Sequence, residues 1–306
     1  MGAAAAGQAK AAGWAAGRRG RIRWIIPLFL LPAVAYTLVF RVAPIGASFY
    51  LSLTDYTMLS RPNWVGLENY RRVLFEYDLF WQAFANTVQF ALEVLPLNIA
   101  LALGLALLVN RAIRGIAAFR AIYYLPSVMS VIAASMVWLW LYNTRVGLLN
   151  SVLAAVGLPA VNWLGNPGTA LHSLVLMRVW KGAGVNMVIY LAGLQGIPVE
   201  LYEAATIDGA GAFQRFRRIT WPLLWPVTFY IIVMGLISTF QTFGEIYAMT
   251  QGGPLESTTT VGYLIYQAAF QYFEMGAASA ISFVLFVVIF TLSVLQLKAY
   301  RSPAEA

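Results

Sequence analysis

The stretch that decides the fold is the polar island Pro198 to Pro226, which reads PVELYEAATIDGAGAFQRFRRITWPLLWP. It lies between two long apolar runs, His172 to Leu194 and Pro222 to Phe243. Apolar runs of this length are typical of membrane-spanning helices. A membrane protein that keeps a charged segment of this size between two spans is expected to use it for contact with something in water.

Locally, the island predicts two short helices with a corner between them. Pro198 suits a first helical turn, and Glu200 and Glu203 lie where the helix dipole favours negative charge. The run Asp208 to Gly211 then predicts a break, because glycine adopts the left-handed conformation of a helix end at little cost. The second helix is expected to carry three arginines: Arg215, Arg217 and Arg218.

The composition indicates an integral membrane protein. Of the 306 residues, 60% are hydrophobic and 10% are charged, whereas a soluble domain has about 25% charged residues. The net charge of +8 is spread over short segments between apolar runs, so it indicates membrane topology and not nucleic-acid binding.

Several kinds of chemistry are excluded or disfavoured by the residues that are missing. The chain has no cysteine, so it has neither a disulfide nor a thiolate metal site. The one histidine, His172, opens an apolar run and has no HExxH-like partner, which favours an interfacial residue over a zinc ligand or a triad member. None of the three lysines follows a glycine, so a GxxxxGK[ST] phosphate loop is impossible. We therefore expect no catalytic residue, no metal and no cofactor.

Six runs are long and apolar enough to span a bilayer, so the fold class we expect is an all-α membrane protein with six transmembrane helices. The fourth is the weakest, because it contains Arg178 and Lys181. The runs are Trp24 to Phe40, Thr87 to Val109, Ile122 to Tyr142, His172 to Leu194, Pro222 to Phe243 and Ala277 to Leu297.

The division of the chain follows from these runs. Residues 1–23 are expected to form a basic cytoplasmic tail, residues 24–300 the transmembrane domain with a cytoplasmic loop at 195–222, and residues 301–306 a second cytoplasmic tail. Most lysines and arginines fall on the side of both termini and of the central loop, which the positive-inside rule assigns to the cytoplasm. The first outer connection, Arg41 to Asn86, is expected to form a small folded cap or an interfacial helix. The third, Thr250 to Thr260, is expected to form turns.

The central loop has two interpretations. A basic amphipathic loop resting on lipid headgroups is one. The other comes from the order of its residues: Glu203-Ala204-Ala205, three residues, Gly209, nine residues, then Ile219-Thr220-Trp221-Pro222. This order resembles the EAA signature of ATP-binding cassette importer permeases, with Trp221 where leucine is usual. In that family the loop docks in a groove of a separate ATPase subunit.

Further segments resemble the carbohydrate branch of these permeases, which includes the maltose, multiple-sugar and glycerol-phosphate importers. They are Val65 to Tyr70, Phe80-Trp81, Asn86-Thr87, Arg120, Leu125-Pro126, Gly147 to Asn150, Leu194 to Pro198, and Thr250 to Thr259. The resemblance covers residues of about 40 to 300 and implies the type I importer permease fold. It also implies a second, homologous permease subunit, two copies of an ABC ATPase subunit, an extracytoplasmic solute-binding protein and a prokaryotic inner membrane. The function it implies is import of a di- or oligosaccharide by alternating access, or of a polyol or glycerol phosphate, without enzymatic activity in this subunit.

Two groups of site residues follow. The resemblance implies that Glu203, Ala204, Ala205, Asp208 and Gly209 couple the permease to the ATPase. For the substrate path, Gly235, Thr239 and Thr242 recur on one stripe of a helix with Gln241 beside it. Polar residues in a span usually face a cavity, although small and hydroxyl residues also serve helix packing. In maltose-type permeases this helix and the segment that matches Gly182 to Asn186 contact the sugar, and the asparagines of that family are replaced here by Thr239 and Thr242.

The charged residues of the spans leave other functions open. Glu93, Arg178 and Lys181 could form a proton relay, or the two cations could lie near a helix end or the cavity while Glu93 pairs with a partner. A proton-coupled secondary transporter using Glu93 or Glu245 would work without an ATPase. A membrane scaffold without transport would tolerate apolar replacement of Thr239 and Thr242.

Overall fold

The computed structural model describes residues 28–110 and 114–300. The regular structure of this part of the chain is helical, apart from one isolated antiparallel bridge between Thr54 and Trp64. The predicted tails, 1–23 and 301–306, lie outside the described residues, as do the first four residues of the predicted span from Trp24 to Phe40.

Most helices follow one another with short connections, and longer ones lie at 53–67, 156–166 and 250–260. The first runs from Leu28 to Ser52 and contains a π-helical turn. The elements are η1 (Leu38–Val42), α2 (Ala43–Ser52), α3 (Glu68–Phe75), α4 (Asp78–Val109), α5 (Ile116–Val128), α6 (Val131–Leu141), α7 (Leu148–Ala155), α8 (Pro167–Gln195), α9 (Val199–Ile207), α10 (Ala212–Arg215), η2 (Phe216–Thr220), α11 (Trp221–Phe240), α12 (Gly244–Met249), α13 (Val261–Tyr266), η3 (Gln267–Gln271) and α14 (Met275–Ala299).

Among the described residues, five helices are long and apolar enough to cross a membrane, and six if the bent pair α5 and α6 counts as one span. The predicted multi-span, all-α fold is therefore confirmed. Several helices are longer than their apolar runs; the first extends to Ser52, for example, and α4 begins at Asp78 instead of Thr87. The extra turns of α4 are polar on one side, and Asp78 lies in the first turn, where the helix dipole favours a carboxylate.

The predicted span from Ile122 to Tyr142 is not one straight helix. The chain bends by 101° between α5 and α6. Met129 and Ser130 have extended backbones, and Ser130 Oγ accepts a hydrogen bond from Ala133 N at 3.2 Å, which caps α6. Hydropathy could not reveal this break, because the residues on both sides of it are apolar.

The predicted second short helix of the central loop is not a separate element. α10 continues through η2 into α11, so that residues Ala212–Phe240 form one helix. Pro222 has no N–H to donate, and the helix accommodates it beside a π-helical turn in which Trp221 N donates to Phe216 O. The predicted corner before this helix is confirmed, since Gly209 has a φ of 77°.

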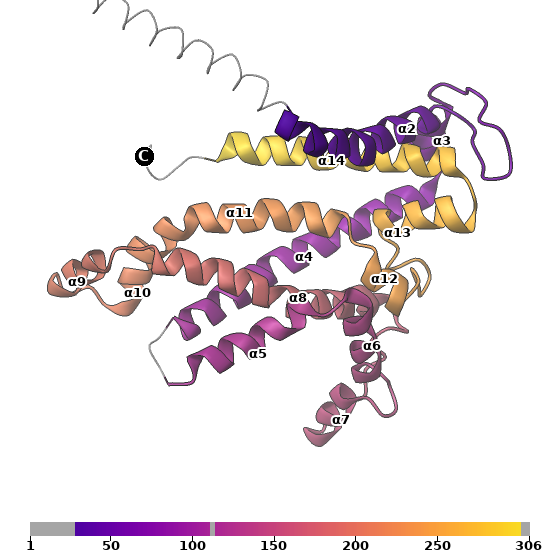
Figure 1. Ribbon diagram of the computed structural model, residues 1–306. Helices are drawn as coiled ribbons and strands as arrows, with labels where there is room; N and C mark the ends of the chain where they lie inside the picture. The colour runs from indigo at the N-terminus through magenta and orange to yellow at the C-terminus, as the bar shows by residue number, and fades with distance from the viewer. Residues whose placement is uncertain (1–27, 111–113, 301–306) are drawn as a thin grey trace, which may run out of the picture.

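Figure 1 shows how the helices are arranged. The pair α4 and α8 makes the most extensive contact, α5 packs on α8, and α11 packs on both. α2 lies along α14 at one side of the molecule (Figure 1). The loop α9–α10 projects at one end, which is also the end where the first helix starts and α14 ends, whereas α6, α7, α12 and α13 gather at the other (Figure 1).

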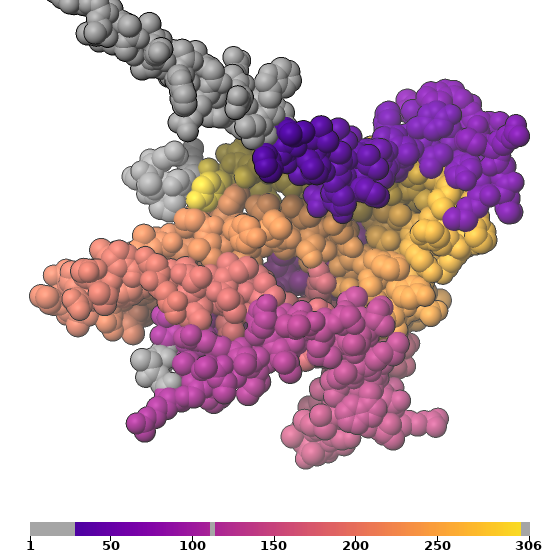
Figure 2. All heavy atoms as spheres, in the orientation of Figure 1, coloured from indigo at the N-terminus to yellow at the C-terminus, as the bar shows by residue number. Residues whose placement is uncertain are grey.

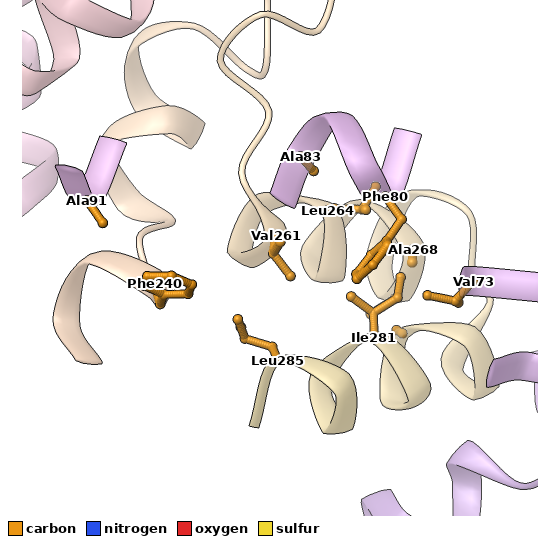
Figure 3. Close-up of a cluster of buried hydrophobic side chains, with 12 residues drawn as sticks. Val73, Phe80, Ala83, Ala91, Phe240, Val261, Leu264, Ala268, Ile281 and Leu285 are labelled. Atoms are coloured by element: carbon orange, nitrogen blue, oxygen red, sulfur yellow. The ribbon is translucent and has the colours of Figure 1, made fainter. Parts of the chain in front are cut away.

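Three groups of buried apolar side chains hold these helices together. The first joins α3, α4, α13 and α14 around Phe80, Leu264 and Ile281 (Figure 3). The second joins α4, α6, α8 and α12, and the third joins α4, α8 and α11. Val94 of the second group and Ile231 of the third both line a cavity, so these two groups adjoin it.

The first outer connection is a small folded cap, as predicted. Its centre is the buried Asn69, whose Nδ2 donates to Ser52 O at 2.8 Å and to Thr54 O at 2.7 Å. Gly276 allows α14 to approach this turn, because a Cβ there would lie 2.1 Å from Thr54 O. One amide side chain thus fixes the cap at the end of the first helix.

The third predicted outer connection forms the turns predicted for it, and its last three residues are buried. Thr258, Thr259 and Thr260 are fully buried, and Thr260 Oγ1 donates to Thr242 O at 2.9 Å. Thr87 Oγ1 of α4 accepts from Val261 N at 3.0 Å. These bonds fix the break between α11 and α12 to the N-terminal half of α4.

Candidate functional site

The first candidate site is the projecting loop from α9 to α10. Arg215 Nη1 donates to Thr206 Oγ1 at 3.0 Å across the corner, and Tyr202 and Thr220 share a hydroxyl hydrogen bond of 2.9 Å at the base. Gly211 N donates to Gln214 Oε1 at 3.0 Å, which closes the first turn of α10. These hydrogen bonds thus fix the conformation of the loop.

The side chains of this loop are accessible at the surface of the protein. No residue of α9 or α10 is buried. Ile207 is 87% exposed and Phe213 is 73% exposed, on either side of the corner. Apolar side chains that project together from the end of a polar loop are typical of a surface that a protein partner covers.

The structure gives each predicted coupling residue a place on this loop. Glu203, Ala204, Asp208 and Gly209 are exposed, and Ala205 is half-buried with its carbonyl accepting from Ala210 N at 2.8 Å. Their role in coupling stays a prediction. Ile207 and Phe213 were not predicted, although two apolar residues that flank a polar Gly-rich corner are a signal of an exposed contact.

The second candidate site is a cavity of about 250 Å³ between α4, α5, α8 and α11. Figure 2 shows the surface hollowed between α11 and α5, with α4 at the base of the hollow. The lining residues are Val94, Leu95, Asn98, Ser127, Arg178, Lys181, Gly182, Val185, Asn186, Ile231, Met234, Gly235, Ser238 and Thr239.

One wall of the cavity carries a pair of amides. Asn186 Nδ2 of α8 donates to Asn98 Oδ1 of α4 at 2.5 Å, and Asn98 Nδ2 donates to Val179 O at 3.3 Å. Gly182 makes room for this contact, because a Cβ there would lie 2.8 Å from Asn98 Nδ2. The remaining amide groups of the pair can bond the hydroxyls of a polar ligand.

The opposite wall is formed by α11. Gly235 lets Leu95 approach, since a Cβ at this glycine would lie 2.5 Å from Leu95 Cδ2. Thr239 lines the cavity but is 2% exposed, and its hydroxyl donates within its own helix to Gly235 O at 2.9 Å. Gln241 is exposed and Thr242 is buried, and neither lines the cavity.

Of the six residues predicted for the substrate path, four therefore border the cavity: Gly182, Asn186, Gly235 and Thr239. Their contact with a substrate stays a prediction. Asn98, Ser127 and Ser238 also line the cavity and were not predicted. Asn98 could have been found by the rule applied to Thr239, because it is a polar residue inside an apolar run.

The charged residues of the spans separate into two groups. Arg178 and Lys181 line the cavity, and Arg178 Nη1 lies 3.4 Å from Glu245 Oε1 of α12. Glu93 is elsewhere: its Oε2 lies 2.7 Å from His172 Nδ1, and its Oε1 accepts from Gln89 at 2.9 Å. The expectation that Glu93 pairs with a partner is confirmed, and His172 is that partner. Within 28–110 and 114–300, no cluster of three or more His, Asp or Glu side chains could hold a metal ion.

Comparisons with known proteins agree on one family. The family described as "Binding-protein-dependent transport system inner membrane component" matches residues 98–303. Trehalose/maltose transport system permease protein MalF of Thermococcus litoralis is 38% identical over 278 residues, which cover 90% of this chain and 92% of that protein. Probable ABC transporter permease protein YesP of Bacillus subtilis is 37% identical over 274 residues and 88% of each chain.

Two further comparisons extend this similarity. sn-Glycerol-3-phosphate transport system permease protein UgpA of Yersinia enterocolitica is 35% identical over 280 residues, 90% of this chain and 93% of that protein. A chain of a bacterial ABC transporter involved in the import of the acidic polysaccharide alginate superposes with a TM-score of 0.81 over 92% of this chain and 96% of that one, at 24% identity. At that identity the superposition shows a common fold.

Proposed function

The chain belongs to the family of binding-protein-dependent transport system inner membrane components, and on this premise we propose that it is the permease subunit of an ATP-binding cassette importer that carries a sugar into the cytoplasm. The observation that carries the proposal is the projecting loop, with the EAA-like order on α9, a corner at Gly209 and exposed apolar residues on both sides of it. A loop built for contact at one end of a membrane protein requires a partner at that end.

The partner we propose is an ABC ATPase, present in two copies, which takes the loop into a groove on its surface. The membrane part of the importer would be completed by a second, homologous permease subunit. Ile207 and Phe213 would be the apolar anchors of the loop, and Arg217 and Arg218 are exposed beside them. The nucleotide is hydrolysed by the partner, since the sequence of this chain excludes a phosphate loop. This chain therefore contributes a transport path and no covalent chemistry.

The orientation follows from the same loop. The loop, the start of the first helix and the end of α14 share one end of the molecule (Figure 1). We assign that end to the cytoplasm, together with the tails 1–23 and 301–306, because the basic residues gather there. The opposite end, with α3, α6, α7, α12 and α13, would receive an external solute-binding protein.

The cargo proposed is a di- or oligosaccharide, and a glycerol phosphate or other polyol is the alternative. The cavity supports this class because an amide pair and two cations lie among apolar side chains, a combination that suits a hydroxylated ligand. Alternating access would open the cavity first to one side and then to the other. A motion of the loop would reach the cavity directly, since α10 continues into α11, which forms one wall.

The experiment that tests the proposal is purification of the tagged protein in mild detergent, followed by mass spectrometry of what co-purifies and an ATPase assay. Wild type is compared with Glu203→Ala and with Gly209→Pro. Co-purification of a second permease and an ATPase with wild type, with loss of the ATPase or of its coupling in the variants, supports the proposal. Uptake by the protein alone in proteoliposomes, driven by a proton gradient, would contradict it.

A further inference from the structure

The central cavity has more positive than negative charge. Arg178 and Lys181 lie one turn apart on α8 and both line it. The carboxylate nearest to either is Glu245 of α12, which lies 3.4 Å from Arg178 and is only 2% exposed. Two cationic side chains, those of Arg178 and Lys181, therefore lie near a single carboxylate, that of Glu245.

Arg178 is already compensated. It forms the ion pair with Glu245, and its Nη2 donates to Ser238 Oγ of α11 at 2.5 Å. These contacts fix the guanidinium between α8, α11 and α12. Glu245 has no second cation within 4.0 Å among the described residues, so its charge is balanced by Arg178.

Lys181 has no direct anionic partner among the described residues. No carboxylate of the described chain lies within 4.0 Å of its Nζ, whose one hydrogen bond is a long one of 3.4 Å to Ser127 O. Glu93 does not reach it, because that carboxylate pairs with His172. Lys181 is also the central residue of α8. A lysine at the centre of a span costs roughly 2.5 to 3.5 kcal/mol on insertion scales, so such residues usually serve a function.

We propose that Lys181 binds a negatively charged group of the cargo, a carboxylate or a phosphate, so that the sugar carried by this permease is anionic. The inference rests on the proposed function and names the charge of its substrate. A lysine ammonium is a compact charge with three donors, which suits either anion. The apolar side chains around it, including Val94, Leu95 and Ile231, lower the local dielectric and strengthen the attraction.

The surroundings of Lys181 fit the rest of such a cargo. Gly182 and Asn186 are on the same helix and border the same space, and Asn98 faces them from α4. The ammonium would hold the acidic group while the amide pair bonds the hydroxyls. A neutral sugar would use the amides alone and would leave the lysine without an anionic partner.

The test is ATP-driven uptake by the intact complex with its solute-binding protein in proteoliposomes. Three radiolabelled probes are compared: digalacturonate, which carries carboxylates, glycerol 3-phosphate, and neutral maltose. Wild type is expected to import one anionic probe, and which one it imports distinguishes carboxylate from phosphate. Lys181→Gln is expected to reduce that uptake at least tenfold, and Lys181→Arg is expected to restore most of it.

Lys298→Gln is the matched control, because Lys298 is exposed in the last turn of α14, and α14 contributes no residue to the lining of the cavity. It should import at the wild-type rate. Import of maltose alone, failure of both anionic probes to enter, or anion uptake that is unchanged in Lys181→Gln would overturn the inference. ATP-dependent import of maltose by wild type would leave the proposed function intact, whereas uptake that persists without ATP and is unaffected by Glu203→Ala would refute the proposed function itself.

Discussion

At Gly184 the backbones of α5 and α8 are in close contact. A Cβ on this buried glycine would lie 2.3 Å from Tyr123 O and 2.9 Å from Tyr124 Cα. Both are backbone atoms, so no side-chain rotation can relieve the contact. Small residues allow helices in membranes to approach in this way. Since an ordinary C···O contact is about 3.3 to 3.6 Å, Gly184→Ala must separate the two helices by roughly 1 Å.

The expected cost of this separation is that of an overpacked core, roughly 1 to 3 kcal/mol. Alanine also gains about 1 kcal/mol over glycine in a helix, which offsets part of the loss. Gly104→Ala on α4 is the control, because Gly104 is exposed and has no atom within 4 Å of the built Cβ. Both variants have the same gain in helix propensity, so the difference between them isolates the steric term.

The assay is unfolding of wild type and both variants in the same detergent, with the free energy of unfolding measured by denaturant titration. We expect Gly184→Ala to be less stable than Gly104→Ala by roughly 1 to 3 kcal/mol. Equal stability of the two variants would show that α5 does not cross α8 at Gly184, and would remove α5 as a wall of the cavity.

Three further predictions concern the loop, the cap and the buried ion pair. Gly209→Ala places a side chain at a φ of 77°, at a cost of roughly 1 to 2 kcal/mol, and should reduce coupled ATP hydrolysis, whereas Gly211→Ala at a φ of −68° should leave it near wild type. Asn69→Ala removes the donor shared by Ser52 O and Thr54 O and should lower the free energy of unfolding by roughly 1 to 3 kcal/mol, with fluorescence of Trp64 reporting a loosened cap. An unchanged stability of Asn69→Ala would contradict that role. Glu245→Gln should destabilise the protein by less than the roughly 3 to 5 kcal/mol of a fully buried pair, because Arg178 borders the cavity, and the double variant with Arg178→Met should recover most of the loss in the same titration. A double variant as unstable as the sum of the two single ones would show that the pair is not coupled.

Much of this protein could be predicted from local patterns. Apolar runs of spanning length determine where the chain can cross a bilayer, because an unbonded backbone is costly in hydrocarbon and favours helices. The corner at Gly209 was predictable because a left-handed conformation favours glycine. Four of the predicted substrate-path residues border the cavity because polar and small residues in a span tend to face the interior.

Other features depend on contacts between distant residues. The 101° bend between α5 and α6 lies within an apolar run, so hydropathy gave no sign of it. The pairing of Arg178 with Glu245, and of Glu93 with His172, required α8 to lie beside α12 and α4. Thr242 has the periodicity of a lining residue. The helix nevertheless ends at Phe240, and the carbonyl oxygen of Thr242 accepts a hydrogen bond from Thr260.

The sequence by itself determined that this is a multi-span membrane protein with a polar, charged loop between two spans and without a GxxxxGK[ST] phosphate loop, because composition, apolar length and motifs are properties of the chain alone. The tertiary structure decided which charges neutralise each other. Arg178 and Lys181 lie in the same apolar run of the sequence, but only Arg178 lies within 4.0 Å of a carboxylate. α12 places Glu245 beside Arg178, whereas α5 places the backbone carbonyl of Ser127 beside Lys181. The positive charge that remains in the cavity is a consequence of that packing.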